Sequence, residues 1–184
     1  MQNSNSNKGV LGLKTLLAMA LFIALSMVFK RFSFTMGPFR ISFENLPLIL
    51  SGIMFGPVVG FITGAVGDIL GCFISGYTII PLITLGAAMI GCVPGVVSFY
   101  CFKDKPTLKI VAAVAFAHLV GSVIIKSIAL HFAYGSPWTM LALRIPLYII
   151  IGAVEGYITY LLMKNKAFVR QMEKMQIKNR KDAD

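Results

Sequence analysis

The sequence predicts an all-α integral membrane protein, a bundle of six transmembrane helices with both termini in the cytoplasm. Of its 184 residues, 57% are hydrophobic and 13% are charged, whereas a soluble domain carries about 25% charged residues. The apolar residues form runs close to the roughly 20 residues that a helix needs to cross a bilayer. No polar segment is long enough to form a separate soluble domain, so almost the whole chain is expected in the membrane.

Proline and glycine divide this apolar sequence into helices. Gly56 and Pro57 separate a short second helix from the third, because the residue before a proline avoids helical conformation. Pro47 is tolerated only near the first turn of its helix, where the missing N–H costs nothing. Pro94 and Pro146 are expected to kink the fourth and sixth helices. The six expected helices cover residues 10–29, 43–55, 58–74, 79–101, 108–130 and 138–163.

Basic residues set the expected orientation. They precede the first helix, fill the segment 103–109 and dominate residues 164–184. Cytoplasmic segments of membrane proteins are rich in lysine and arginine, which places these regions inside the cell. We therefore expect a disordered cytoplasmic N-terminus (1–9), a transmembrane domain (10–163) and a basic cytoplasmic tail (164–184). Lys30 and Arg31 then fall in an outer loop against the usual bias, which favours an anionic ligand on the outer side.

Six titratable side chains interrupt the apolar runs: Glu44, Asp68, His118, Lys126, Arg144 and Glu155. Each costs about 2.5–3.5 kcal/mol at mid-bilayer, so each needs a partner or a water-filled cavity. Glu44, Asp68, Lys126 and Arg144, together with Arg40, are expected toward the outer half of the membrane. His118 is expected nearer the middle and Glu155 in the inner half. His118, Ser122 and Lys126 are spaced four residues apart and form one stripe on the fifth helix. Lys126 either pairs with Asp68 or Glu44 as a structural ion pair or lines an outward-facing pocket with them.

The second helix is expected to begin at the mouth of that pocket, with the positive end of its dipole facing outward. Arg40 and the first-turn amides can then meet an anion, while Glu44 and Asn45 can meet hydrogen-bond donors. The loops 30–40 and 131–137 are expected to cover the pocket; the aromatic side chains in and beside them, such as Phe34 and Trp138, otherwise form an interfacial aromatic belt.

Catalytic and metal-binding motifs are not recognised in the sequence. The cysteines at 72, 92 and 101 have no CxxC spacing and are expected to be packing residues. No HExxH motif, phosphate-binding loop or nucleophile–base pair is found. We therefore expect no enzyme activity, no metal and no cofactor.

The segment GPFRISFENLPLILSGIMFGPVVGFITGAVGDILG (37–71) resembles the substrate-binding S components of energy-coupling factor (ECF) vitamin transporters, and most closely their folate-specific members. The resemblance covers essentially the whole chain and includes LRIPLY on the sixth helix. It implies a vitamin-binding subunit of a bacterial cell membrane that works with a membrane scaffold protein and two cytoplasmic ATPases. It also implies that Ala20 and Ala24, a small-residue pair on the first helix, form the docking face for the scaffold.

Folate matches the expected charges of the pocket. Its glutamate tail suits Arg144, Lys126 or Arg40, its pterin edge suits Asp68 or Glu44, and its benzoyl ring suits Phe34, Tyr77 or Trp138. The nearest alternative keeps the fold and changes the ligand to riboflavin, pantothenate, thiamine or a queuosine precursor. A membrane-embedded enzyme using Asp68 and His118 is less favoured, because Asp68 is expected on the outer side and His118 nearer the middle of the membrane. A channel or secondary carrier is less favoured because it needs a continuous polar path and the inner half offers only Glu155.

Overall fold

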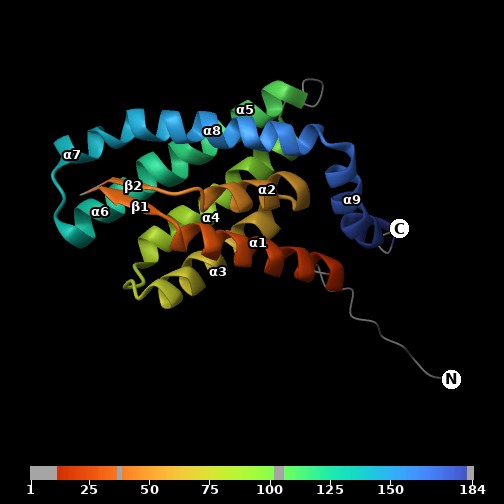
Figure 1. Ribbon diagram of the computed structural model, residues 1–184, viewed down its shortest axis with the longest axis horizontal. Helices are drawn as coiled ribbons and strands as arrows, with labels where there is room; N and C mark the ends of the chain where they lie inside the picture. Colours follow the sequence, from red (N-terminus) through yellow and green to blue (C-terminus); the bar gives the residue numbers. More distant parts are fainter. Residues whose placement is uncertain (1–11, 37–38, 102–105, 182–184) are drawn as a thin grey trace.

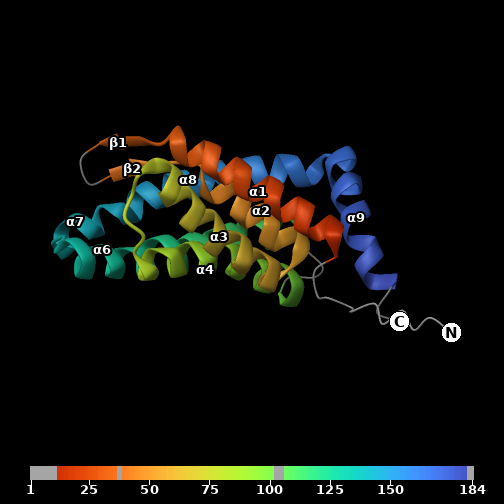
Figure 2. The same ribbon diagram turned by 90° about the horizontal axis from the view of Figure 1, so that it is seen from below.

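The computed structural model describes residues 12–36, 39–101 and 106–181 and shows a bundle of long helices that run roughly side by side (Figures 1 and 2). The elements are, in order, α1 (Leu13–Arg31), β1 (Phe34–Met36), β2 (Phe39–Ile41), α2 (Asn45–Phe55), α3 (Pro57–Ser75), α4 (Pro81–Tyr100), α5 (Pro106–Ala117), a π-helical segment (His118–Ile125), α6 (Lys126–Tyr134), α7 (Trp138–Ala142), α8 (Arg144–Lys164) and α9 (Lys166–Lys181).

Within these described ranges, five helical stretches are long and apolar enough to cross a membrane. They are Leu13–Arg31, Pro57–Ser75, Pro81–Tyr100, Thr107–Tyr134 and Arg144–Lys164. The second expected helix (43–55) is present as α2, but it has only 11 residues, which span about 16 Å. Every residue of α2 from Asn45 to Met54 is buried. The short α2 therefore lies inside the bundle, surrounded by the longer helices.

Glycine allows α4 to pack closely against its neighbours. A Cβ atom on Gly91 would collide with the backbone of Gly60 in α3, and a Cβ atom on Gly52 in α2 would collide with the carbonyl oxygen of Gly91. These three backbones can approach only because the side chains are absent, as is common between membrane helices. The core beside them is built from Ile49 of α2, Ile90 of α4 and the alanines of α5.

Two helix boundaries follow directly from the sequence. Gly56, with φ of 94°, separates α2 from α3, whose first residue is Pro57. Pro146 has no N–H to bond to the carbonyl of Ala142, so the expected sixth helix is divided into α7 and α8 at Leu143. Pro94, by contrast, lies within α4 without ending it.

Several sequence expectations need correction. Lys30 and Arg31 belong to the last turn of α1 rather than to a loop, and the loop that follows contains a two-stranded antiparallel hairpin, with Thr35 paired to Arg40. The region expected as a basic tail contains a regular helix, α9, which crosses the end of the bundle opposite the hairpin (Figures 1 and 2). Its Phe168, Met172 and Met175 join a core cluster with α1 and α2. The N-terminal segment 1–9 lies outside the described residues.

Candidate functional site

A cavity of about 230 Å³ opens at the end of the bundle that carries the hairpin and the α6–α7 turn. Its walls come from α1, α2, α3, α4, α6 and α8, together with the residues just before α2 and the segment between α3 and α4. Five charged side chains line it: Lys30, Glu44, Asp68, Lys126 and Arg144. The cavity is therefore the place where charges from five different helical regions meet within an otherwise apolar bundle.

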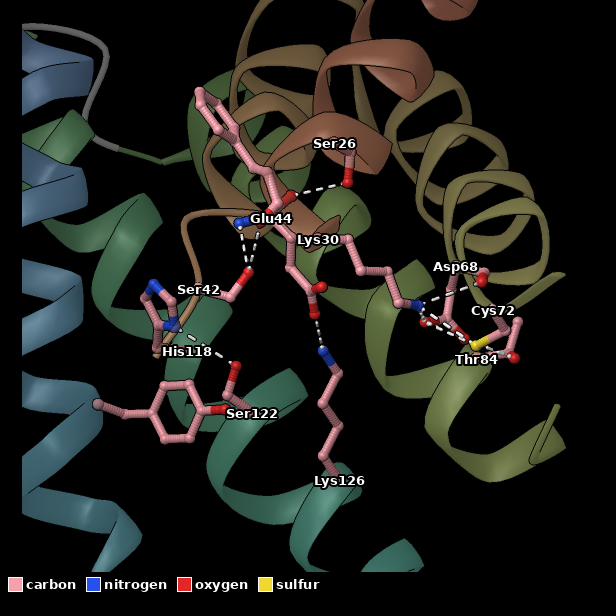
Figure 3. Close-up of polar contacts among 12 residues, drawn as sticks. Ser26, Lys30, Ser42, Glu44, Asp68, Cys72, Thr84, His118, Ser122 and Lys126 are labelled. Carbon is pink, nitrogen blue, oxygen red and sulfur yellow. Dashed lines mark hydrogen bonds and ion pairs between the residues drawn. The ribbon is translucent and has the colours of Figure 1, made fainter. Parts of the chain in front are cut away.

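The first charged pair joins α1 to α3. Lys30 Nζ lies 2.8 Å from Asp68 Oδ1 and also donates to the carbonyl oxygen of Asp68 and to Cys72 Sγ, each at 3.3 Å. The other carboxylate oxygen, Asp68 Oδ2, accepts a hydrogen bond of 2.8 Å from Thr84 Oγ1 of α4 (Figure 3). Both side chains of the pair are about 95% buried, with exposed fractions of 5% and 6%. Asp68 is thus held by partners from two neighbouring helices.

A second pair joins α6 to the start of α2. Lys126 Nζ lies 3.7 Å from Glu44 Oε1, a longer separation than in the first pair (Figure 3). The backbone of Glu44 is fixed on both sides, because its N–H donates to Ser42 Oγ at 3.1 Å and its carbonyl accepts from Ser26 Oγ at 2.9 Å. The first turn of α2 is therefore anchored to α1 while the carboxylate of Glu44 reaches toward α6.

Arg144, the first residue of α8, is the remaining cation of the cavity. Its Nη2 donates to the hydroxyl of Tyr148 at 3.0 Å, and its guanidinium carbon lies 5.2 Å from the centre of the Tyr148 ring. Arg144 is only 7% exposed, yet its Nη1 has no hydrogen-bond partner among the described residues. A cation at the start of a helix also lies against the positive end of the helix dipole. Both features favour an anion beside Arg144.

A third polar pair lies behind the cavity, between the π-helical segment and α8. His118 Nε2 lies 2.7 Å from Glu155 Oε2, and His118 Nδ1 lies 3.4 Å from Ser122 Oγ. Glu155 is fully buried. Neither His118 nor Glu155 belongs to the cavity lining, so this pair joins the π-helical segment to α8 without facing the cavity.

The structure brings five of the residues expected from the sequence onto the cavity lining: Glu44, Asp68, Tyr77, Lys126 and Arg144. His118 lies behind it. Phe34 and Trp138 are 63% and 55% exposed and lie outside the lining, with Trp138 stacked on His131 at 4.4 Å between ring centres. The side chain of Arg40 lies outside the described side chains. Ala20 and Ala24 are both exposed on α1.

Sequence reasoning missed two charged or polar contacts of the cavity, those of Lys30 and Tyr148. Lys30 directly follows an apolar run, so its position in the sequence predicts a loop. Tyr148 is one of several aromatic residues within apolar helices, and its residue type alone does not set it apart. The available signal was spacing: Tyr148 follows Arg144 by four residues, which places the two on one helix face. No group of three metal-ligating side chains occurs in the part of the chain that the structure describes.

Comparison with known proteins identifies the family to which this chain belongs. Residues 10–168 match the family described as "ECF-type riboflavin transporter, S component". The chain belongs to this family of ECF S components. As an S component, it is a membrane-embedded subunit of a vitamin transporter.

Curated relatives of this S component match over shorter segments. The "Folate transporter FolT" of Clostridium novyi (strain NT) is 46% identical over 57 residues, which are 30% of this chain and 33% of the relative. The "Uncharacterized protein MG313 homolog" of Mycoplasma pneumoniae (strain ATCC 29342 / M129 / Subtype 1) is 40% identical over 67 residues, which are 36% of this chain and 24% of the relative. The matched segments thus span about a third or less of each curated relative.

Solved structures match over most of the chain. One, described as "Crystal structure of FolT bound with folic acid", has a TM-score of 0.68 and 27% identity, and the match covers 82% of this S component and 93% of that chain. Another, "Structure and mechanism of the S component of a bacterial ECF transporter", has a TM-score of 0.64 and 23% identity, covering 84% and 95%. The second likeness supports the fold alone.

Proposed function

We propose that this S component binds folate in the cavity at the hairpin end of the bundle and delivers it across the bacterial cell membrane with a scaffold protein and two ATPases. The observation that carries the proposal is the buried guanidinium of Arg144, a residue of the cavity lining whose Nη1 has no hydrogen-bond partner among the described residues. A carboxylate is the natural partner of such a group, because it accepts charge-assisted hydrogen bonds from the planar guanidinium.

The charges around Arg144 support an anionic ligand. Lys30 is paired with Asp68 and Lys126 faces Glu44, whereas no carboxylate of the described residues pairs with Arg144. The described side chains that line the cavity therefore carry one positive charge more than negative charges. Folate brings carboxylates on its glutamate tail, and two relatives whose names include FolT are similar to this chain.

Riboflavin is the second candidate, because the matching family model is described by that vitamin. Riboflavin has an uncharged ring system and an uncharged ribityl chain, so it offers no carboxylate to Arg144. The unpaired guanidinium nitrogen therefore favours folate over riboflavin. A ligand with a permanent positive charge, such as thiamine, would meet repulsion from the same guanidinium.

The orientation follows from the distribution of basic residues. The first turn of α1, which contains Lys14, and the first turn of α5, which contains Lys109, are basic, as is the sequence of α9. The starts of α1 and α5, and α9, lie at the end of the bundle away from the hairpin (Figure 1). Because basic ends of membrane helices remain in the cytoplasm, we assign that end, and with it both termini, to the cytoplasm. The cavity then faces the outside, where a vitamin is captured.

Equilibrium binding to the purified protein tests the folate assignment. Arg144→Ala is expected to weaken folic acid binding by about 2–5 kcal/mol, the cost of removing one partner from a desolvated charge pair. The same variant should bind methylpterin, which has no glutamate tail, nearly as well as the unchanged protein does. Arg170→Ala, an exposed change on α9 at the opposite end, is the matched control and should bind both ligands normally. Equal losses for the two ligands would refute the role of Arg144 in holding the tail.

A further inference from the structure

Asn45, the first residue of α2, has a buried oxygen that the fold does not use. Its side chain lines the cavity and is only 3% exposed. The amide oxygen Oδ1 has no hydrogen-bond partner among the described residues. Buried acceptors without a donor are uncommon and destabilising. The lack of a partner for this oxygen is explained if a ligand supplies the donor.

The position of Asn45 does not give it a structural role as a helix cap. Asparagine caps a helix from the N-cap position by accepting from a backbone N–H of the first turn, but the N-cap of α2 is Glu44, and Asn45 is the first helical residue. The Oδ1 of Asn45 accepts no hydrogen bond from the described residues. The neighbouring backbone is anchored, because Glu44 is hydrogen-bonded to Ser26 and Ser42.

The two carboxylates on the cavity lining already have partners. Asp68 Oδ1 accepts from Lys30 and Asp68 Oδ2 accepts from Thr84, while Glu44 Oε1 lies 3.7 Å from the ammonium of Lys126. A neutral N–H group that entered the cavity would have to compete with a cation for either carboxylate. Asn45 Oδ1 offers a neutral acceptor without that competition.

We infer that Asn45 Oδ1 accepts a hydrogen bond from an amino or ring N–H group on the heteroaromatic part of the ligand and thereby determines which vitamin is selected. This inference rests on the proposed function, since it assumes that a vitamin with such a ring occupies the cavity. It assigns the ring edge to Asn45 rather than to Asp68. The ligand is then recognised at two points: its anionic group at Arg144 and its neutral hydrogen-bond donor at Asn45.

Paired ligands that differ only in the donor test this inference. Folic acid is compared with its analogue in which a methyl group replaces the pterin amino group, both in equilibrium binding to the purified protein. The unchanged protein should prefer folic acid by about tenfold to a hundredfold, the usual effect of leaving a buried polar group unpaired. Asn45→Ala and Asn45→Leu should reduce this preference to within about threefold. Asn45→Asp, which keeps an acceptor oxygen at the same place, should retain it.

Two control variants distinguish loss of a specific hydrogen bond at Asn45 from a general loss of ligand binding. Ile83→Ala removes an apolar part of the lining and should weaken both ligands equally, leaving the ratio unchanged. Arg144→Ala should also weaken both members of this pair alike, because both carry the glutamate tail. A ratio that is unchanged in both the alanine and the leucine variants of Asn45 would overturn the inference and leave the folate proposal standing.

The outcome for the unchanged protein distinguishes the two proposals. If it binds riboflavin and not folic acid, the folate proposal fails, and the role of Asn45 is measured with riboflavin and riboflavin methylated on its ring N–H. Loss of discrimination in Asn45→Ala would then still support the inference. Binding of neither vitamin would overturn both proposals.

Discussion

Replacing Lys30 with methionine tests the ion pair that closes the inner wall of the cavity. Methionine has a similar length and keeps the apolar contacts of the lysine stem, but it cannot donate a hydrogen bond. The change removes the donor at 2.8 Å from Asp68 Oδ1 and the donor to the carbonyl oxygen of Asp68 at 3.3 Å. Asp68, whose side chain is 6% exposed, then retains the hydroxyl of Thr84 at 2.8 Å and the weakly donating thiol of Cys72 at 3.9 Å.

The expected loss of stability follows from this burial. Breaking a buried ion pair by removing one partner costs about 3–5 kcal/mol, because a charge remains without compensation. For a protein of this length, about 1 kcal/mol lowers the midpoint of thermal unfolding by roughly 2–4 °C. Lys30→Met should therefore lower that midpoint by roughly 6–20 °C. A double variant, Lys30→Met with Asp68→Leu, should recover most of the loss, because apolar replacement of a whole buried pair is often neutral.

Thermal unfolding of the detergent-purified protein, followed by size-exclusion chromatography after heating, measures these midpoints. Lys164→Met, a change at an exposed lysine near the opposite end, is the control and should shift the midpoint by less than about 2 °C. A shift equally small for Lys30→Met would refute the reasoning, as would a double variant that is less stable than the single one.

Three further predictions concern other parts of the molecule. Glu155→Ala leaves the buried imidazole of His118 without its 2.7 Å partner and should cost about 3–5 kcal/mol of stability. Glu155→Gln keeps an acceptor oxygen and should cost less than half as much. Equal losses of the two variants in thermal unfolding would contradict the pairing of His118 with Glu155. Gly91→Leu should lower the free energy of unfolding by about 3 kcal/mol or more, because the new side chain forces α3 away from α4. Gly67→Ala is its control, because the new Cβ would have ordinary contacts, and it should leave the size-exclusion elution profile unchanged. Cys101, a free and exposed cysteine at the end of α4, should react with a membrane-impermeant maleimide in inside-out vesicles and not in intact cells; labelling of intact cells would reverse the assigned orientation.

Helix content was largely predictable because it depends on local sequence. Apolar runs of sufficient length identified the long helices, and Gly56 with Pro57 located the boundary between α2 and α3. The helix α9 was missed because its composition is polar, although Phe168, Met172 and Met175 repeat with the spacing of one helix face. The hairpin was missed because its strands have only three residues each.

The composition of the site was only partly predictable, because pairing depends on contacts between distant segments. The charged residues were recognised individually, since any charge within an apolar run is conspicuous. Of their partners, only Glu44 was predicted, as one of two alternatives for Lys126. The other pairs were not predicted: Lys30 and Asp68 are 38 residues apart, and His118 and Glu155 are 37 residues apart. Sequence spacing gives no information about which of several opposite charges will meet across helices. The unpaired atoms of Asn45 and Arg144 could be found only after every other partner was assigned.

The π-helical segment His118–Ile125 ends just before Lys126, a residue of the cavity lining, and gives this part of the chain an unusual kind of evolutionary freedom. Its hydrogen bonds run from residue i to i+5, so it holds more residues per turn than an α-helix. Loss of a single residue there can be absorbed by a return to α-helical bonding, which keeps the flanking segments close to their present orientation. Such a deletion would leave Lys126 beside Glu44. A change in chain length, and not only a substitution, is thus open to descendants of this protein without loss of the cavity wall.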